Sequence, residues 1–525
     1  MGPLSFSTFF TSSDLALHLL ILPGEHRGRA MDEIRDVLVV GGGINGVSIA
    51  RDAAGRGWSV CLCEQDDLAA HTSSASTKLI HGGLRYLQFG QFALVRKALR
   101  ERSVLHRLAP HLVTPTTFVL PHARHLRPIW MLRAGLWLYD HLAEAGPAFP
   151  RSRRLNLRAD PRGAALKPRY RTAFTYADAR VDDARLVIAT AMDARERGAE
   201  IRVRTRCEQL IRHRDHWLAV LRQPDGTMQR MRVRAVVNAT GPWAGNLLLR
   251  AGLDAPIGLR LVQGSHIVVP RLYAHDCAYL LQQPDQRVVF VIPFEQDYSL
   301  IGTNDLDYEG DPAQVRATPE EVAYLCAAVT TWLRSPVEPE HVVWQYSGVR
   351  PLLADHHLDA AKVTRDYRLH LDAQQALMLS VLGGKLTTCR TLAEEAVDQL
   401  GAALGRSEPA WTATGPALPG GEGGSVDAVL PALQAAYPGQ PDALLRDLVR
   451  RHGTRVGAVL GDAQTPEALG VHFGAGLYQR EVDYLVEHEW AVEADDILWR
   501  RSHLGLRLDA AQQAALRDHL RRLQG

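Results

Sequence analysis

The amino-acid sequence predicts an α/β protein in which separated segments build one parallel sheet, accompanied by a mixed-sheet domain and a C-terminal helical domain. Three observations indicate this class: a buried strand that ends in a glycine turn near the start, further buried runs that stop on glycine far along the chain, and a C-terminal segment, 426–525, with helical periodicity and little strand signal. With 525 residues, 46% of them hydrophobic and 22% charged, the chain suits a globular protein of two or three domains.

The first element is the buried run DVLVV at 36–40. GGGINGVSIARDAAGRG and WSVCLCE follow, so a strand, a tight turn, a helix and a second strand form a parallel unit. Gly41, Gly43 and Gly46 give the pattern G-x-G-x-x-G, which lets a pyrophosphate approach the helix N-terminus. Glu64 lies where a carboxylate accepts hydrogen bonds from a ribose. This context predicts a Rossmann-like, dinucleotide-binding domain.

The elements that follow alternate between helices and strands. VDDARLVIATAMDARERGAEIRVRT predicts a helix capped by Asp182 and Asp183 and then a strand, so both carboxylates are caps rather than catalytic acids. RAVVNATGPWAG is a second buried run that stops on a glycine, Gly241. The block 257–348 is rich in Val, Ile, Tyr and Phe and predicts a mixed or antiparallel sheet.

The chain then returns to the same pattern before its helical end. ALMLSVLGGKLTTCRTLAEEAVDQL predicts a buried strand, a Gly-Gly turn and a long amphipathic helix. EPAWTATGPALPGGEGGS is rich in Pro and Gly, which is typical of a linker.

Composition excludes several classes of protein. A formal charge of +2 and a pI near 8.2 do not favour nucleic acid as the main partner. The scattered cysteines indicate reduced thiols and a cytoplasmic setting, and no apolar run reaches the roughly 18 residues of a membrane-spanning helix. Segment 1–30 has no basic stretch before its apolar patch, so we expect a disordered or misassigned start, with Met31 as the true beginning, rather than a signal peptide.

Motifs for metal or hydrolase chemistry fail on inspection. DLDYEG starts like a calcium loop at Asp305, but Arg316 stands at the twelfth position, where a bidentate Glu is needed. GGKLTT imitates a phosphate loop without the full Walker A pattern, and H-E-x-x-H, paired C-x-x-C and G-x-S-x-G are missing from the sequence. We therefore expect no metal site and no serine hydrolase.

The spread of glycine-ended strands, from Gly41 to Gly384, favours FAD over a nicotinamide cofactor. An extended flavin cofactor can be held by segments far apart in sequence. A helix that begins near Leu386 would place its N-terminus at the pyrimidine edge of the flavin and stabilise the negative charge of the reduced ring. Taken alone, the strand-GGK-helix element leaves a simple packing turn as the less favoured alternative.

An ordered set of motifs, TSSASTKLIHGGLRYL, NATGPW, GSHIVVP, YSGVRPL and GGKLTT, resembles the FAD-dependent glycerol-3-phosphate dehydrogenases, most closely the bacterial aerobic, quinone-linked ones. LVEHEW and DDILWRR are similar to the helical tail of that family. The resemblance implies a D-amino-acid-oxidase/glutathione-reductase-like fold and oxidation of sn-glycerol 3-phosphate to dihydroxyacetone phosphate by hydride transfer to FAD. It further implies ubiquinone as electron acceptor, a peripheral location at the cytoplasmic face of the bacterial inner membrane, and a role in glycerol and glycerophospholipid catabolism and respiration.

These expectations define a domain layout. The FAD-binding domain is expected to be discontinuous, over 31–110, 175–256 and 349–405; the substrate-binding or cap domain covers 111–174 and 257–348, a linker covers 406–425, and the helical domain covers 426–525.

A phosphate ester calls for a cationic clamp, and arginine is favoured for its fork of donors. Oxidation of the secondary alcohol also requires a group that takes the hydroxyl proton. By resemblance, the pocket is lined by Arg85, Tyr86, Thr303 and Lys385, mainly as substrate anchors, and by His266 and Arg350 at the reacting hydroxyl.

We count His266, Arg350 and Lys385 as catalytic, with His266 as the general base because arginine rarely loses its proton. Outside this motif set, His266 would more often be a hydrogen-bonded structural histidine, and Arg85 a surface or salt-bridge arginine.

The residues expected at the cofactor come from the glycine turns and from the run before HGGLRYL, where the glycine pair is expected to bring backbone close to the flavin ring. Ser73 and Ser74 would bind through their hydroxyls and Lys78 through its charge, although loop and helix capping would also explain this run. The full set is Gly41, Gly43, Asn45, Gly46, Glu64, Ser73, Ser74, Lys78, Gly82, Gly241, Gly384, Leu386 and Thr387.

The segment RHLRPIWMLRAGLWLYDHL at 124–142 mixes arginine with tryptophan and tyrosine, which suits a helix lying on a lipid surface. A buried helix between domains is the alternative. Two other functions stay open: a glycerophosphate oxidase that uses O₂, and a non-catalytic flavin-bearing interaction protein. A homodimer is possible.

Overall fold

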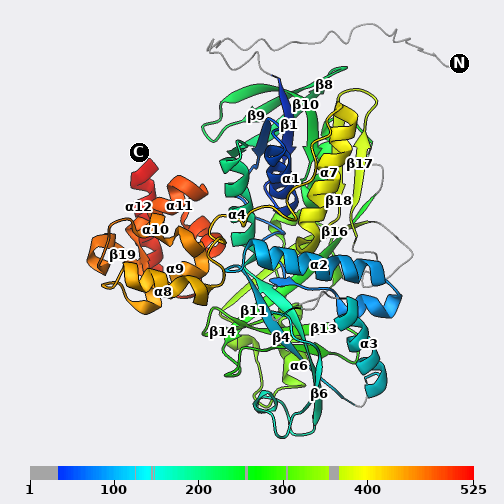
Figure 1. Ribbon diagram of the computed structural model, residues 1–525, viewed down its shortest axis with the longest axis vertical. Coiled ribbons are helices and arrows are strands. Elements are labelled where there is room, and N and C mark those ends of the chain that lie inside the picture. Colours follow the sequence, from blue (N-terminus) through cyan, green and yellow to red (C-terminus); the bar gives the residue numbers. More distant parts are fainter. Residues whose placement is uncertain are drawn as a thin grey trace, which may run out of the picture. The chain divides into compact units, whose positions relative to one another are not determined.

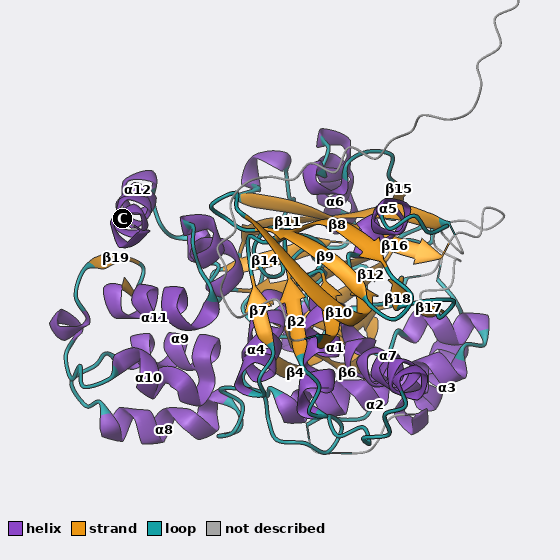
Figure 2. Ribbon diagram, turned by 90° about the horizontal axis from the view of Figure 1, so that it is seen from above, coloured by secondary structure: helices purple, strands orange, loops and turns teal. Residues whose placement is uncertain are grey.

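The computed structural model describes residues 34–123, 126–142, 146, 148–254, 258–302, 305–353 and 366–524. Within this part of the chain, two large sheets and a C-terminal group of helices form the architecture (Figures 1 and 2). The predicted parallel sheet, mixed sheet and helical C-terminal segment are all present. Thr303 lies outside the described residues.

The first sheet has eight strands in the described residues, and its central strands run parallel. The parallel strands are β1 (Arg35–Val40), β2 (Val60–Cys63), β7 (Glu200–Arg202), β10 (Met228–Asn238) and β18 (Leu377–Leu382), and the antiparallel additions are β8 (Arg206–Arg212), β9 (Trp217–Arg222) and β17 (Arg368–Asp372). β1, β2 and β18 are nearly continuous apolar runs because both faces of the sheet are covered there, whereas β7 and the first half of β10 carry charged residues.

Three helices pack together against this sheet. They are α1 (Ile44–Gly55), α4 (Asp183–Glu196) and α7 (Cys389–Leu404), whose apolar side chains join one buried cluster with β1, β2 and β18 (Figure 2). The short α5 (Ala244–Arg250) packs on the strand that leads into it, β10.

The start of α4 corrects one prediction. Asp182 is the N-cap, and its carboxylate accepts a hydrogen bond from the Arg185 backbone N–H at 3.1 Å. The prediction that Asp183 is also a cap is wrong, because Asp183 is the first helical residue and its buried carboxylate lies 2.5 Å from Lys78 Nζ.

The second sheet has ten strands among the described residues and is mostly antiparallel, with one parallel pair, β4 with β12. The predicted boundaries at 175 and 349 fall inside β6 and β16, which continue without a break. The strands are β3 (Leu79–Ile80), β4 (Val113–Pro121), β5 (Arg153–Asn156), β6 (Thr172–Val181), β11 (Leu259–Pro270), β12 (Ala278–Gln282), β13 (Val288–Phe294), β14 (Tyr298–Gly302), β15 (Leu306–Asp307) and β16 (Trp344–Leu353).

Helices cover both faces of the second sheet. α6 (Pro319–Thr330) packs over one face, where alternate strand residues such as Ile267 join its cluster. α2 (Phe92–Leu108) and α3 (Ile129–Leu142) contribute to the cluster on the opposite face, which contains Val268. Among the described residues, none of the helices combines the length and the apolar character needed to cross a membrane.

The C-terminal segment is helical, as predicted. It consists of α8 (Val426–Ala436), α9 (Asp442–His452), α10 (Val456–Leu460), α11 (Gln479–Glu489), α12 (Ala510–Gln524), a π-helical turn η9 (Asp496–Arg501) and a small hairpin, β19 (His472–Gly474) with β20 (Leu477–Tyr478). The predicted linker, 406–425, is irregular but docked, since Thr412 and Leu418 within it are buried. All six cysteines are unpaired in the structure, and five of them are buried.

Candidate active site

Three glycine-ended strands lie side by side in the first sheet. β18, β10 and β1 are parallel neighbours, with Asn238 of β10 in register with Val40 and Ser380. Gly41, Gly241 and the pair at 383–384 follow these strands, so the turns meet at one edge of the sheet. Parallel α/β sheets bind ligands beyond the carboxyl ends of their strands. The structure thus brings together the segments that the sequence predicts at the cofactor.

The turn after β1 has no room for side chains. Gly41 has φ +114°, and a Cβ on it would lie 2.6 Å from the carbonyl oxygen of Ala239. A Cβ on Gly46 would lie 1.9 Å from the carbonyl oxygen of Gly41. Both glycines are required for the turn to fold back between α1 and β10, which is the geometry of a phosphate-binding turn.

Polar side chains surround this turn. The Ser73 hydroxyl accepts a hydrogen bond from the Ile44 N–H at 3.0 Å, at the first residue of α1. The Glu64 carboxylate accepts hydrogen bonds from the N–H groups of Gly42 at 2.6 Å and Asp66 at 2.9 Å. Burial raises the pKa of Glu64, and these N–H groups oppose that rise. Each carboxylate oxygen keeps a second lone pair that a ribose hydroxyl can use.

The Gly383-Gly384 turn lies against the start of α1. Both glycines have positive φ, +80° and +97°, and a Cβ on Gly384 would lie 2.9 Å from Asn45 Nδ2. Asn45 Oδ1 is buried and accepts no hydrogen bond from the described residues. After Lys385 come a 3₁₀ turn, η6 (Leu386–Thr388), and α7, and in neither does a described side chain cap the first N–H groups. The N–H groups of Thr388 and Cys389 donate to the carbonyl oxygens of Lys385 and Leu386, and a helix N-terminus of this kind attracts an acceptor.

This set of groups fits an extended dinucleotide. The turn excludes any Cβ, the N-cap residues of η6 and α7 make no side-chain cap, and one buried amide oxygen has no donor among the residues described. Phosphate oxygens, ribose hydroxyls and a flavin ring N–H complement such groups.

Neighbouring side chains leave no room for a Cβ at either glycine of HGGLRYL. A Cβ on Gly82 would lie 2.6 Å from Leu99 Cγ and from the Tyr139 hydroxyl, and a Cβ on Gly83 would lie 2.3 Å from Tyr86 Cδ2. The protein's own side chains therefore exclude a Cβ at both positions, and the approach of this backbone to the flavin stays a prediction.

Two expected substrate anchors from segments far apart in the sequence meet next to this turn. Lys385 Nζ lies 5.1 Å from the centre of the Tyr86 ring. Arg85, which precedes Tyr86 at the start of η1 (Leu84–Phe89), is half-buried and makes no ion pair with any described residue. A cation in this state suits an anionic ligand.

His266 is held on all sides within the second sheet. Its ring stacks on Tyr346 from the neighbouring strand, with centres 4.8 Å apart and planes 13° apart. A Cβ on Gly302 would lie 1.9 Å from His266 Cδ2, so the ring lies directly on that backbone. His266 Nε2 and Thr77 Oγ1 are 3.0 Å apart, whereas Nδ1 is buried and has no hydrogen-bond partner in the described part of the chain.

The surroundings keep His266 neutral. Burial lowers its pKa well below 6.5, and the positive charges of Arg350 and Lys78 lower it further. A neutral imidazole is the form that accepts a proton. Arg350 is half-buried and donates to Asp305 Oδ1 at 2.6 Å.

Lys78 does not have the expected role. Its ammonium is buried, lies 2.5 Å from Asp183 Oδ1 and donates to the Ser74 carbonyl oxygen at 3.1 Å. Because its charge is balanced inside the protein, we withdraw Lys78 from the predicted cofactor contacts. The Ser74 hydroxyl donates to the His71 carbonyl oxygen at 3.2 Å, which is the capping alternative for that residue.

Two residues of this site were missed in the sequence, Thr77 and Tyr346. Both lie inside motifs that carry the family resemblance, TSSASTK and YSGVRP. The period of two in a strand places Tyr346 on the same face as Arg350, so that spacing was the available signal.

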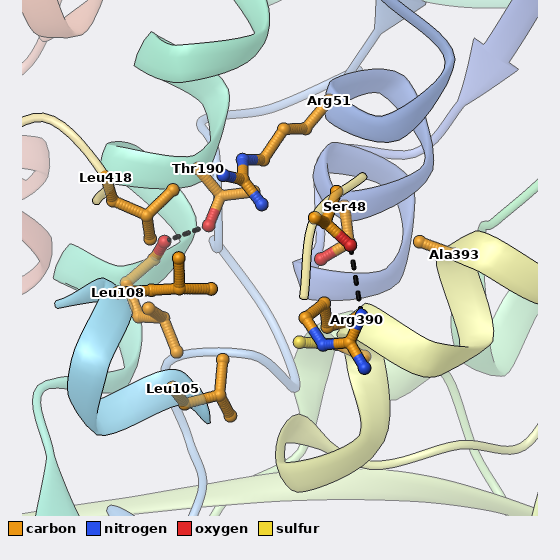
Figure 3. A pocket seen from close by; sticks show the side chains of 11 residues that line it. Ser48, Arg51, Leu105, Leu108, Thr190, Arg390, Ala393 and Leu418 are labelled. Atoms are coloured by element: carbon orange, nitrogen blue, oxygen red, sulfur yellow. Dashed lines mark hydrogen bonds between the residues drawn. The ribbon is translucent and has the colours of Figure 1, made fainter. Parts of the chain in front are cut away.

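A separate small hollow lies where α1, α2, α4 and α7 meet residues 412–418 (Figure 3). Arg390 donates to Thr412 Oγ1 at 3.1 Å, and the Thr190 hydroxyl donates to the Leu186 carbonyl oxygen at 2.7 Å. Its lining contains none of the predicted site residues, so we assign it to the packing of the docked linker.

Comparisons with known proteins identify the family. Residues 36–390 match the model for FAD dependent oxidoreductases, and residues 412–520 match the C-terminal domain of alpha-glycerophosphate oxidase. The chain is 50% identical over 492 residues to the glycerol-3-phosphate dehydrogenase of Pseudomonas aeruginosa, covering 93% of this chain and 95% of that protein. This chain belongs to the family of FAD-dependent glycerol-3-phosphate dehydrogenases.

Other members of the family agree. The aerobic glycerol-3-phosphate dehydrogenase of Escherichia coli K12 is 45% identical over 493 residues, which cover 93% of this chain and 97% of that one. The crystal structure of the glycerol-3-phosphate dehydrogenase from Bacillus halodurans, complexed with FAD, superposes with a TM-score of 0.73 at 25% identity and covers 94% of each chain. The predicted family, fold class and FAD cofactor of this dehydrogenase are confirmed.

Proposed function

We propose that this dehydrogenase oxidises sn-glycerol 3-phosphate to dihydroxyacetone phosphate and that its electrons pass from FAD to ubiquinone in the bacterial inner membrane. The observation that carries the substrate assignment is the meeting of Tyr86 with Lys385, next to Arg85, which has no ion pair with the residues described. Two cations and a phenol gathered from distant segments suit a dianionic phosphate ester.

The cofactor would be held by the three strand-end turns. The Gly41–Gly46 turn and the amides at the start of α1 would receive the pyrophosphate, Glu64 a ribose, and the turn at Gly384 the flavin ring. When bound, FAD supplies the acceptor for the hydride that leaves the substrate C2.

His266 would take the hydroxyl proton at Nδ1, the atom without a partner among the described residues. In that tautomer Nε2 carries the hydrogen and donates to Thr77 Oγ1, which fixes the ring orientation. Arg350 would stabilise the negative charge that develops on the substrate oxygen. The alcohol thus loses one proton to His266 and one hydride to FAD, which balances the oxidation to a ketone.

The decisive experiment is anaerobic addition of glycerol 3-phosphate to the purified, FAD-loaded protein. We expect the visible absorbance of the oxidised flavin to bleach with glycerol 3-phosphate and to persist with glycerol, which lacks the phosphate. Persistence with both compounds would refute the substrate assignment. Hydrogen peroxide released in air at the rate of turnover would favour the oxidase alternative, and reduction of a soluble ubiquinone analogue favours the dehydrogenase.

The membrane assignment is supported by an exposed aromatic surface on α3 and η1. Trp130 is 68% exposed and Trp137 is 61% exposed, and within α3, which is fully described, Leu136 and Tyr139 are the buried residues. The alternative prediction, a helix buried between domains, does not fit the exposure of Trp130 and Trp137. Figure 1 shows α3 beside α2, and Phe89, at the end of η1, is also exposed, 45%.

The exposed aromatic surface on α3 and η1 includes residues only a few positions away in sequence from the candidate substrate clamp. η1 carries Arg85 and Tyr86 at its start and the exposed Phe89 at its end. Exposed arginines on and beside α3, Arg127 and Arg133, provide the cationic rim that anionic lipids attract. A lipid-soluble quinone that arrives through this surface would therefore reach the site over a short path.

Charge reversal at both arginines tests this proposal. We expect Arg127→Glu/Arg133→Glu to lose binding to vesicles that contain anionic phospholipid, because each basic residue near such a surface contributes about 1 kcal/mol. The matched control is Arg517→Glu/Arg522→Glu on α12, which changes net charge equally at exposed positions of the C-terminal domain. Equal vesicle binding by both double variants would contradict the assignment.

A further inference from the structure

A row of aromatic rings connects the C-terminal domain to His266. Trp499, in η9, stacks on Trp344 with ring centres 4.6 Å apart and planes 18° apart. Trp344 contacts Tyr346 at 4.9 Å, and Tyr346 stacks on His266 at 4.8 Å. The row therefore runs from the DDILWRR motif to the side chain that faces the reacting hydroxyl in the proposed function.

The second sheet sets the spacing of the inner three rings. Trp344 and Tyr346 are two residues apart on β16 and so point to the same face. The register of β11 with β16 places His266 opposite Tyr346. The Tyr346 hydroxyl donates to the Ser76 carbonyl oxygen at 2.9 Å, which fixes the phenol between the strand and the loop that carries Thr77.

The outer end of the row is fixed as firmly. A Cβ on Gly505 would lie 2.4 Å from Trp499 Cζ2, so the indole is held between the Gly505 backbone and the Trp344 ring. Arg500 and Arg501 directly follow Trp499 and bind the buried carboxylate of Asp67, with Arg500 Nε 2.5 Å from Asp67 Oδ2. Trp499 is thereby pinned to the loop that follows β2 in the cofactor-binding sheet.

We propose that Trp499 is a positioning residue for the proton acceptor, acting through Trp344 and Tyr346 to fix the plane of the His266 ring and to keep water away from it. The inference rests on the proposed function, in which His266 accepts the substrate proton. It gives the C-terminal domain a part in catalysis without placing any of its residues at the substrate. The outer and inner contacts of the row are stacked, with planes 18° and 13° apart, and the middle contact is tilted at 42°, so each ring limits the movement of the next through direct packing.

Loosening the row has a defined effect on the pKa of His266. Burial is the main cause that holds this pKa low, and Lys78 and Arg350 add to it. Lys78 pairs with Asp183, Arg350 pairs with Asp305, and the phenol ring of Tyr346 stacks on the imidazole. If water enters, the charged imidazolium is better solvated, and the pKa rises toward 6.5. Proton acceptance is then lost at a higher pH than in the unaltered protein.

The test compares Trp499→Leu, Trp499→Phe and Trp490→Leu as holoenzymes. Trp490 is the matched control because it belongs to the same domain, but its ring lies 4.6 Å from the Arg195 guanidinium and outside the row. We expect Trp499→Leu to move the acid limb of kcat/KM upward by about half a pH unit or more. Trp499→Phe, which keeps a stacked ring, and Trp490→Leu should leave the limb in place.

A second readout does not depend on turnover. Titration of the His266 ring by NMR, assigned through the signal lost in His266→Asn, should show the same upward shift in Trp499→Leu. If glycerol 3-phosphate does not reduce the flavin, the proposed function fails while this shift still tests the positioning role. A rate loss that is equal at every pH, with an unmoved titration, would overturn the inference and leave the row as packing.

Gly505→Ala provides an independent perturbation if Trp499→Leu does not fold. Its added methyl group would collide with the indole, and Gly505 has no positive φ that alanine would strain. We expect it to shift the acid limb in the same direction as Trp499→Leu. An unshifted limb in Gly505→Ala would count against the positioning role in the same way.

Discussion

Replacing Arg85 by alanine removes the cation on which the proposed substrate clamp depends. The guanidinium is half-buried, lacks an ion pair within the described part of the chain, and precedes Tyr86, which contacts Lys385. Its removal therefore leaves no described carboxylate without a counter-ion. The variant should fold and retain FAD, so that a loss of activity reports on the substrate.

The expected loss follows from the strength of a charge-assisted hydrogen bond. Such a bond contributes about 1.5–3 kcal/mol, and a bidentate contact from arginine to phosphate lies at the upper end. Lys385 stays in place and holds part of the charge, so we expect about 2–3 kcal/mol, which is about 30- to 160-fold in kcat/KM for glycerol 3-phosphate. Arg85→Lys should recover part of it, because an ammonium keeps the charge without the fork.

The assay is anaerobic flavin reduction followed by stopped-flow absorbance over a range of glycerol 3-phosphate concentrations, with the FAD-to-protein ratio measured on each preparation. Arg96→Ala is the matched control, since Arg96 is exposed on α2 only a short distance along the chain. The reasoning would be refuted if Arg85→Ala lost no more activity than Arg96→Ala, or if its loss tracked a loss of bound FAD.

Two further predictions concern cofactor binding and folding. Gly46→Ala should lose FAD and unfold at a lower temperature, because its Cβ would lie 1.9 Å from a carbonyl oxygen. Gly245→Ala, with open space around it in α5, should keep FAD. Retention of FAD by both variants, read from the visible absorbance of the purified proteins, would contradict this prediction. Asp183→Asn should destabilise the protein by about 3–5 kcal/mol, since it leaves the Lys78 ammonium buried without a counter-ion, and adding Lys78→Met should restore much of that loss in denaturant unfolding. Additive losses in the double variant would show that the two groups do not act as a pair.

The parallel sheet could be predicted because its signals are local. A central strand covered on both faces must be a continuous apolar run, as in β1, and a turn that folds back on a helix must be glycine where a Cβ would collide. The same signals recur before Gly241 and Gly384, and the structure places all three strand ends at one edge. Sequence order alone does not give that adjacency; it follows from the rule that parallel strands bind ligands at their carboxyl ends.

The partners within the HGGLRYL region could not be predicted, because they come from distant segments. Gly82 is excluded from carrying a side chain partly by Tyr139, and Lys78 is neutralised by Asp183. A glycine or a lysine in a loop indicates that another group lies close to it. The adjacent residues in the sequence do not determine whether that group belongs to a ligand or to another part of the protein.

The ion pairs that dock the C-terminal domain are better explained by geometry than by stability. Asp67 and Arg501 are almost fully buried, and burying such charges costs about as much free energy as their attraction returns. Apolar residues of similar volume would hold the domain as tightly, but they would tolerate small shifts in its position. A carboxylate shared by two arginines fixes one position, since a displacement leaves a buried charge unpaired. Trp499 stacks on Trp344 only if the C-terminal domain keeps one position. We infer that the ion pairs of Asp67 with Arg500 and Arg501 are present because they hold the domain where the row of rings that ends on His266 stays in contact.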